Sequence, residues 1–161
     1  MNSVDLEILL VEDNQDDVDL ALHALQQGKL ANNVVVARDG EEALDFLFCR
    51  GVFAQRSFER PPKLVLLDLK LPRVDGMEVL KQVKSDPRTK TIPIVIMTSS
   101  KEERDLVAGY NLGANSYIQK PVDFDQFRET VKSIGLYWLV INQPVPVSFV
   151  REVAKAELIS G

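Results

Sequence analysis

Acidic side chains stand where two short apolar runs of the sequence end. Glu12 and Asp13 directly follow the run Ile8–Val11. Asp68 closes a second run, 64–67, which is the most uniformly apolar in the chain. If these runs are neighbouring parallel strands, three carboxylates meet at the sheet edge where open α/β sheets bind ligands. Carboxylates that close repel one another, and Mg²⁺, which takes oxygen ligands, would neutralise them.

Two further polar residues follow later expected strands. Thr98 comes after the apolar run 94–97. Lys120 comes after the short segment 116–118 and precedes Pro121. Each residue has an ordinary alternative explanation: an acid after a strand is often a helix N-cap, and Thr98 could be a simple strand residue. The whole set nevertheless lies at the carboxyl ends of different expected strands, which favours one shared function. The Lys120–Pro121 bond is a candidate cis peptide.

The elements that would position these residues follow from hydrophobic periodicity. Apolar runs predict strands over 8–11, 64–68 and 94–97, and two further short segments, 33–36 and 116–118, complete the alternation of strands and helices. Helical spacing predicts helices over 16–28, 40–48, 76–85, 101–112 and 124–140. A run apolar at every position is typical of a strand buried on both faces, as in parallel sheets. We therefore expect an α/β protein with a five-stranded parallel sheet, doubly wound as (βα)5.

Composition narrows the class of protein. The 161 residues suit one domain, and the net charge of −5 argues against nucleic-acid binding, which needs a basic surface. A single cysteine excludes an internal disulfide framework and a cysteine-based zinc site, and fits a reducing cytoplasm. No apolar run approaches the ~18 residues that span a bilayer, and the acidic start is no signal peptide. We expect a cytoplasmic protein that binds neither nucleic acid nor membranes.

Five motifs together resemble the receiver domain of two-component response regulators. They are Val11-Glu12-Asp13-Asn14, Leu66-Leu67-Asp68, Leu71-Pro72-Arg73-Val74-Asp75-Gly76, Met97-Thr98-Ser99 and Lys120-Pro121. The resemblance covers about residues 5 to 140 and implies the flavodoxin-like receiver fold. It divides the chain into a receiver domain, 5–141, and a C-terminal extension, 142–161, with a proline-containing turn and a short amphipathic helix.

The resemblance also implies a phosphoacceptor and a magnesium site. Asp68 would accept a phosphoryl group from the phosphohistidine of a histidine kinase. Asp13 would bind Mg²⁺ directly, Glu12 would bind it through water, and the backbone carbonyl of Lys70 would complete the protein ligands. A carboxylate is a competent nucleophile toward phosphorus, so the chemistry supports this role for Asp68.

Three further residues would stabilise and transmit the phosphorylated state. Thr98 would hydrogen-bond to the phosphoryl group and Lys120 would form an ion pair with it. Tyr117 stands at the aromatic switch position of the family, where the ring would turn inward as Thr98 moves toward the phosphoryl group. Tyr117 could equally be an ordinary core aromatic.

Output would be a protein-interaction surface, and the chain would not itself be an enzyme. About 20 residues follow the receiver domain, too few for a helix-turn-helix module. The apolar run that includes Tyr137 and Trp138 predicts a homodimer through the fourth helix, fifth strand and fifth helix; alternatively, Trp138 covers the core edge. The long basic connection 49–63 and the aromatic C-terminal region resemble single-domain regulators that serve bacterial phytochromes.

The same residues argue against two other functions and leave two alternatives open. Haloacid-dehalogenase-type phosphatases need a second acid two residues after the nucleophile, and Lys70 stands there. A flavodoxin-like cofactor binder needs a hydroxyl- and glycine-rich phosphate loop, whereas residues 12–17 are mostly acidic. A phosphorelay intermediate and a chemotaxis-type motor regulator remain open alternatives.

Overall fold

The computed structural model describes residues 7–27, 33–99, 108 and 110–136. The strands of this part form one parallel sheet in the order β2-β1-β3-β4-β5. They are β1 (Ile8–Val11), β2 (Val34–Ala37), β3 (Leu64–Asp68), β4 (Ile94–Thr98) and β5 (Ser116–Gln119). The helices are α1 (Gln15–Gln27), α2 (Gly40–Leu47), α3 (Gly76–Ser85) and α5 (Phe124–Ser133), with a short 3₁₀ helix, η2 (Gly51–Phe53). The predicted five-stranded, doubly wound fold is therefore confirmed.

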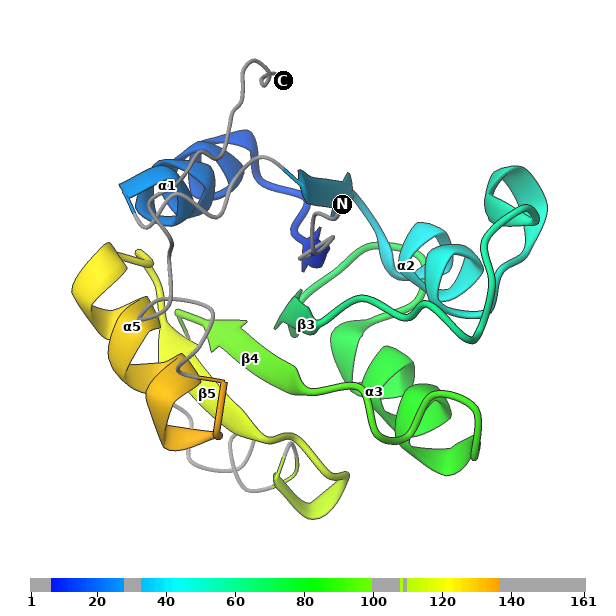
Figure 1. Cartoon of the computed structure of the whole chain (residues 1–161). Coiled ribbons are helices and arrows are strands. Elements are labelled where there is room, and N and C mark those ends of the chain that lie inside the picture. The colour runs from blue at the N-terminus through cyan, green and yellow to red at the C-terminus, as the bar shows by residue number, and fades with distance from the viewer. Residues whose placement is uncertain (1–6, 28–32, 100–107, 109, 137–161) are drawn as a thin grey trace, which may run out of the picture.

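Helices cover both faces of the sheet: α1 and α5 lie on one face, and α2 and α3 on the other (Figure 1). Side chains of β3 alternate between these two layers, as the period of a strand requires. Leu64 and Leu66 pack with α1 and α5, whereas Val65 and Leu67 pack with α2 and α3. All four are completely buried, which explains why this run is apolar at every position.

Polar caps at the strand ends start the helices that follow. Asp39, Asp75 and Asp123 each accept a hydrogen bond from the backbone N–H three residues later, at the starts of α2, α3 and α5. Asn14 caps α1 in the same way, accepting a bond of 2.9 Å from the N–H of Asp17. These caps satisfy orphan N–H groups and place each helix N-terminus at the functional edge of the sheet.

The last described helix is shorter than its sequence predicts. We expected a helix over 124–140, but α5 ends at Ser133. Gly135 adopts a φ of +86°, and its N–H donates to the carbonyl oxygen of Lys132. The N–H of Leu136 donates to the carbonyl oxygen of Val131. This Schellman arrangement ends the helix at a glycine that the apolar pattern had hidden.

Several expectations concern residues outside the described ranges. The predicted helix 101–112 falls there except for residues 108 and 110–112. Tyr137, Trp138 and the C-terminal extension 142–161 fall there entirely. Among the described residues, no helix is both long and apolar enough to cross a membrane.

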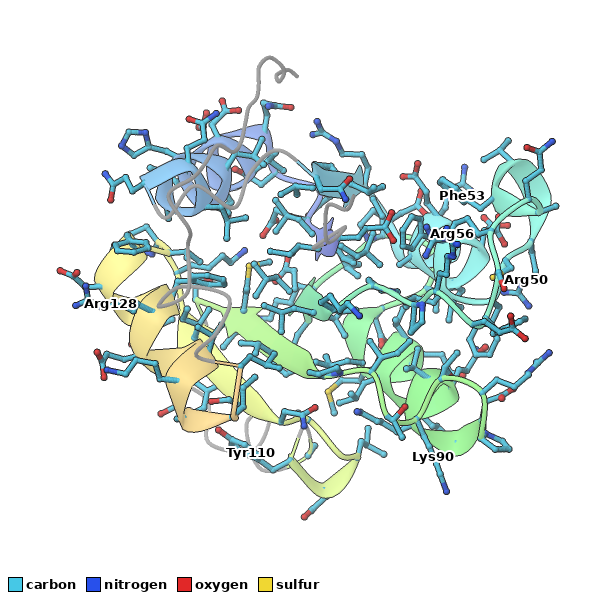
Figure 2. All side chains as sticks on the ribbon, in the orientation of Figure 1. Arg50, Phe53, Arg56, Lys90, Tyr110 and Arg128 are labelled. Carbon is cyan, nitrogen blue, oxygen red and sulfur yellow. The ribbon has the colours of Figure 1, made fainter. Side chains whose placement is uncertain are left out.

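The long connection 49–63 is held by contacts between arginines and aromatic rings (Figure 2). The Arg56 guanidinium stacks on the Phe46 ring at 3.6 Å and forms an ion pair of 3.0 Å with Glu7. Phe53 meets Phe46 edge to face, with ring centroids 5.1 Å apart. Since the connection leads into the start of β3, it lies at the sheet edge opposite to Asp68.

Gly76, the first residue of α3, packs directly on the backbone that follows β3. A Cβ atom there would lie 2.2 Å from the carbonyl oxygen of Asp68 and 2.7 Å from the Cα of Leu69. We expect Gly76→Ala to destabilise the protein by about 1–3 kcal/mol, because backbone must move to admit the methyl group. Urea unfolding measures this change.

Lys81→Ala, on the exposed side of the same helix, is the matched control. It should change the unfolding free energy by less than about 0.5 kcal/mol. Equal stabilities of Gly76→Ala and Lys81→Ala would contradict this close packing.

Candidate functional site

Three carboxylates converge at the carboxyl ends of β1 and β3. The strand order reverses between these strands, so a crevice for ligands is expected there. The parallel register pairs Val11 with Leu67, which brings the following Glu12 beside Asp68. Carboxylate oxygens of Glu12, Asp13 and Asp68 all lie within 4.8 Å of one another. Glu12 and Asp68 are buried, whereas Asp13 faces solvent.

Lys120, which follows β5, reaches into this group of carboxylates. Its Nζ lies 2.9 Å from Oε1 of Glu12 and 3.4 Å from Oδ1 of Asp68. The Lys120 side chain is only 11% exposed. The peptide bond to Pro121 is cis, as the sequence indicated. The ammonium thus compensates part of the negative charge that the strand ends bring together.

Burial dominates the electrostatics of the two inner carboxylates. It raises the pKa of Glu12 and the pKa of Asp68, although the nearby Lys120 opposes both shifts. For Lys120, burial alone would lower the pKa. The hydrogen bond to Glu12 and the charges of Asp68 and Glu12 outweigh burial and raise the pKa above its ordinary value.

Hydrogen bonds hold Glu12 in place. One of its oxygens accepts from Lys120, and the other accepts from the backbone N–H of Asn14 at 3.2 Å. Asn14, rather than Asp13, is the residue that caps α1. Helix capping therefore explains Asn14 and does not account for the carboxylate of Asp13.

The other residues singled out in the sequence lie around this group at different depths. Thr98 is buried at the end of β4, and its carbonyl accepts a bond of 3.1 Å from the N–H of Lys120. Lys70 is exposed, two residues after Asp68, and its backbone N–H hydrogen-bonds to the Asp68 carboxylate.

Tyr117 lies apart from the carboxylates, on the surface of β5. It pairs in register with Ile96, which stands two residues before Thr98. The side chains of Tyr117 and Thr98 therefore share a face of the sheet. The Tyr117 side chain is 44% exposed and meets the Tyr110 ring edge to face at 5.9 Å. Figure 2 marks Tyr110 at this edge of the molecule. Tyr117 is therefore not a core aromatic in this structure.

Asp17 is a residue of the site that sequence reasoning missed. Its Oδ2 lies 3.1 Å from Nζ of Lys120, so it is a third carboxylate in contact with the ammonium. In the sequence, Asp17 is one of several acids in a row and stands in the first turn of the predicted helix 16–28. That position, soon after the first strand, was the available signal, but it does not indicate the contact with Lys120.

The three oxygen donors fit a hard divalent cation. Their chemistry is purely carboxylate, and their mutual distances allow one ion to contact all three. The exposed position of Asp13 leaves room for water ligands, which Mg²⁺ normally retains. Burial is the largest cause of the raised pKa values of Glu12 and Asp68, so both carboxylates are held in surroundings that disfavour their charged forms.

Comparison with known proteins identifies the class. The family model of the response regulator receiver domain matches residues 8–132. The chain therefore belongs to the response regulator receiver family of two-component signalling.

Three relatives show which response regulators this chain is similar to. The bacteriophytochrome response regulator AtBRR is 51% identical, with a TM-score of 0.76, and the match covers 84% of this chain and 96% of AtBRR. Response regulator Rcp1 of Synechocystis sp. is 37% identical over 82% of this chain and 88% of Rcp1, and the Mn²⁺-bound Rcp1 structure matches with a TM-score of 0.68. The probable methanogenesis regulatory protein FilR2 of Methanothrix harundinacea is 40% identical over 84% of this chain and 85% of FilR2. The chain is thus related to phytochrome response regulators, and also to a regulator named for another process.

The burial of the Asp68 carboxylate predicts an effect on stability. Because the pKa of Asp68 is raised in the folded protein, its ionised form costs stability at neutral pH, above the ordinary pKa. Asp68→Asn removes that charge at nearly constant shape and should stabilise the protein by on the order of 1 kcal/mol. Urea unfolding at neutral pH in EDTA measures the change.

Asp16→Asn serves as the control, since Asp16 is exposed in the first turn of α1. It removes a charge that favours the helix N-terminus and should cost a few tenths of a kcal/mol, roughly. A loss of stability in Asp68→Asn would show that Lys120 more than compensates the Asp68 charge, contrary to this account.

Proposed function

We propose that this chain is a single-domain response regulator that accepts a phosphoryl group on Asp68 from a histidine kinase, with Mg²⁺ as cofactor. One observation carries the proposal: a buried carboxylate at the end of β3 lies 3.4 Å from a lysine and within 4.8 Å of two further acids. Family membership supports it, because phosphoryl acceptance at this strand end is the function of the receiver domain.

The transfer is a substitution at phosphorus. An oxygen of the Asp68 carboxylate attacks the phosphorus of the kinase's phosphohistidine, and a P–O bond forms as the P–N bond breaks. The imidazole leaves with the electron pair of the broken bond. Lys120 stands within reach of the new phosphoryl oxygens and stabilises their charge.

The metal site would be built from the same edge. Asp13 and Asp68 would hold Mg²⁺ directly, Glu12 through water, and the Lys70 backbone carbonyl would complete the set. When bound, Mg²⁺ supplies positive charge that neutralises the carboxylates and the transferred phosphoryl group. The mutual distances of the carboxylate oxygens support this ligand set.

Thr98 and Tyr117 would convert phosphorylation into a change of surface. Thr98 would hydrogen-bond to the phosphoryl group, and Tyr117 would turn inward into the space that it leaves. The shared face of the two side chains and the exposed ring of Tyr117 beside Tyr110 support this switch. The exposed ring corresponds to the unphosphorylated arrangement.

The partner would be a histidine kinase of the phytochrome type, in a cytoplasmic pathway. The identity with AtBRR supports this assignment. Dimerisation through the fourth helix, fifth strand and fifth helix, with Tyr137 and Trp138, belongs to the same proposal and rests on the sequence. The basic connection 49–63 lies at the sheet edge opposite to Asp68, so the kinase can reach Asp68 without it.

Phosphorylation by a small donor tests the function directly. Incubation with acetyl phosphate and Mg²⁺ should add about 80 Da to the intact mass, the increment of one phosphoryl group. The gain should disappear in EDTA, because the carboxylates then lack the cation that offsets their charge. Intact-protein mass spectrometry makes the measurement.

Two variants complete this test. Asp68→Asn should gain nothing, and Asp16→Asn, which alters an exposed acid of α1, should gain the same mass as the natural chain. If a phosphorylated histidine kinase also failed to add the group to the natural chain, the proposed function would be wrong.

A further inference from the structure

The ammonium of Lys120 contacts three carboxylates, and one of them belongs to helix α1. Nζ lies 2.9 Å from Glu12, 3.1 Å from Asp17 and 3.4 Å from Asp68. The contacts to Glu12 and Asp17 are hydrogen bonds, and the contact to Asp68 is a longer ion pair. Because an ammonium has three N–H donors, oxygen acceptors added at Asp68 compete for them with Glu12 and Asp17.

The local fold aims Asp17 at Lys120. The Asn14 cap fixes the first turn of α1, and Val18, Ala21 and Leu25 bury the inner side of the helix against the sheet. Asp17 stands at the border of this buried side, and its side chain is 29% exposed. Asp16, one residue earlier, faces solvent. Adjacent acids on one helix turn thus have different surroundings.

The two shorter contacts of Lys120, to Glu12 and to Asp17, would respond differently to phosphorylation. Glu12 also accepts from the backbone of Asn14 and belongs to the group of carboxylates that fits a cation. Asp17 is not a member of that group and contacts Lys120 from the helix. A phosphoryl group on Asp68 adds acceptor oxygens and negative charge beside Lys120.

We propose that Asp17 is a positioning residue that holds Lys120 in the unphosphorylated protein and competes with the phosphoryl group for its N–H donors. This inference rests on the proposed phosphoryl acceptance by Asp68. Phosphorylation then draws Lys120 away from Asp17 and weakens the ion pair that connects α1 to the end of β5. The resting state is favoured by this contact, and the charge of Asp17 also disfavours an anion at Asp68.

Binding of beryllofluoride, a mimic of the aspartyl phosphoryl group, tests the competition. The dissociation constant in Mg²⁺ is measured by titration, following backbone amide NMR signals. Asp17→Asn removes the competing charge at nearly constant shape and should bind beryllofluoride about three- to tenfold more tightly than the natural chain. Asp17→Ser, a smaller neutral replacement, should shift the constant in the same direction.

Charge-matched controls separate this role from general effects. Asp16→Asn makes the same change of net charge on the same helix turn without touching Lys120, and should stay within about twofold of the natural chain. Asp17→Glu keeps the negative charge, so its dissociation constant for beryllofluoride should also stay within about twofold of that of the natural chain. A merely structural role of Asp17 would lower the unfolding free energy of the neutral variants without tightening beryllofluoride binding.

The outcomes are distinguishable. If the natural chain does not bind beryllofluoride, the proposed function fails. If it binds, and both neutral Asp17 variants bind equally or more weakly, the role of Asp17 is wrong while the proposed function stands. Equal tightening in Asp16→Asn would also overturn the inference, since the effect would then come from net charge alone.

Discussion

The crowding of carboxylates around one lysine is the constraint on which the rest of this structure depends. Glu12 and Asp68 are buried at the ends of neighbouring strands, and burial raises the pKa of both. Lys120 contacts both carboxylates, and Asp17 as a third. Negative charge still exceeds positive charge at this edge. In the proposed function a bound cation would lower this excess of negative charge, and Lys120 would form an ion pair with the phosphoryl group.

The parallel sheet makes this crowding possible because all strands end at the same edge. The β1–β3 register sets Glu12 beside Asp68, and the alternation of side chains directs residues 64, 66 and 68 toward the α1 and α5 side. Capping residues then start the helices that follow β2, β3 and β5. Gly76 allows α3 to start against the carbonyl of Asp68. Asp68 is thus held by backbone packing on one side and by its ion pair with Lys120 on the other.

Much of this arrangement was predictable from the sequence, and the exceptions have physical reasons. Apolar runs located β1, β3 and β4 because these central strands are buried on both faces. The outer strands β2 and β5 are only partly buried, and β5 includes polar residues. Helix α5 ended early because the apolar period continued past Gly135, whose left-handed conformation stops the helix. Asp17 was missed because its contact with Lys120, 103 residues away, depends on how α1 packs in the fold, which local spacing does not encode. The exposure of Tyr117 likewise depends on its tertiary neighbour Tyr110.

Locating the phosphoryl group after transfer from a kinase tests the central claim most directly. The chain is incubated with a phosphorylated histidine kinase and Mg²⁺, then treated with borohydride, which reduces an aspartyl phosphate to homoserine. Peptide mass spectrometry then identifies the altered residue. The account predicts homoserine at position 68, where the buried carboxylate faces Lys120. Homoserine at position 13 or 17, or none anywhere after a transfer that phosphorylates a control receiver, would contradict it.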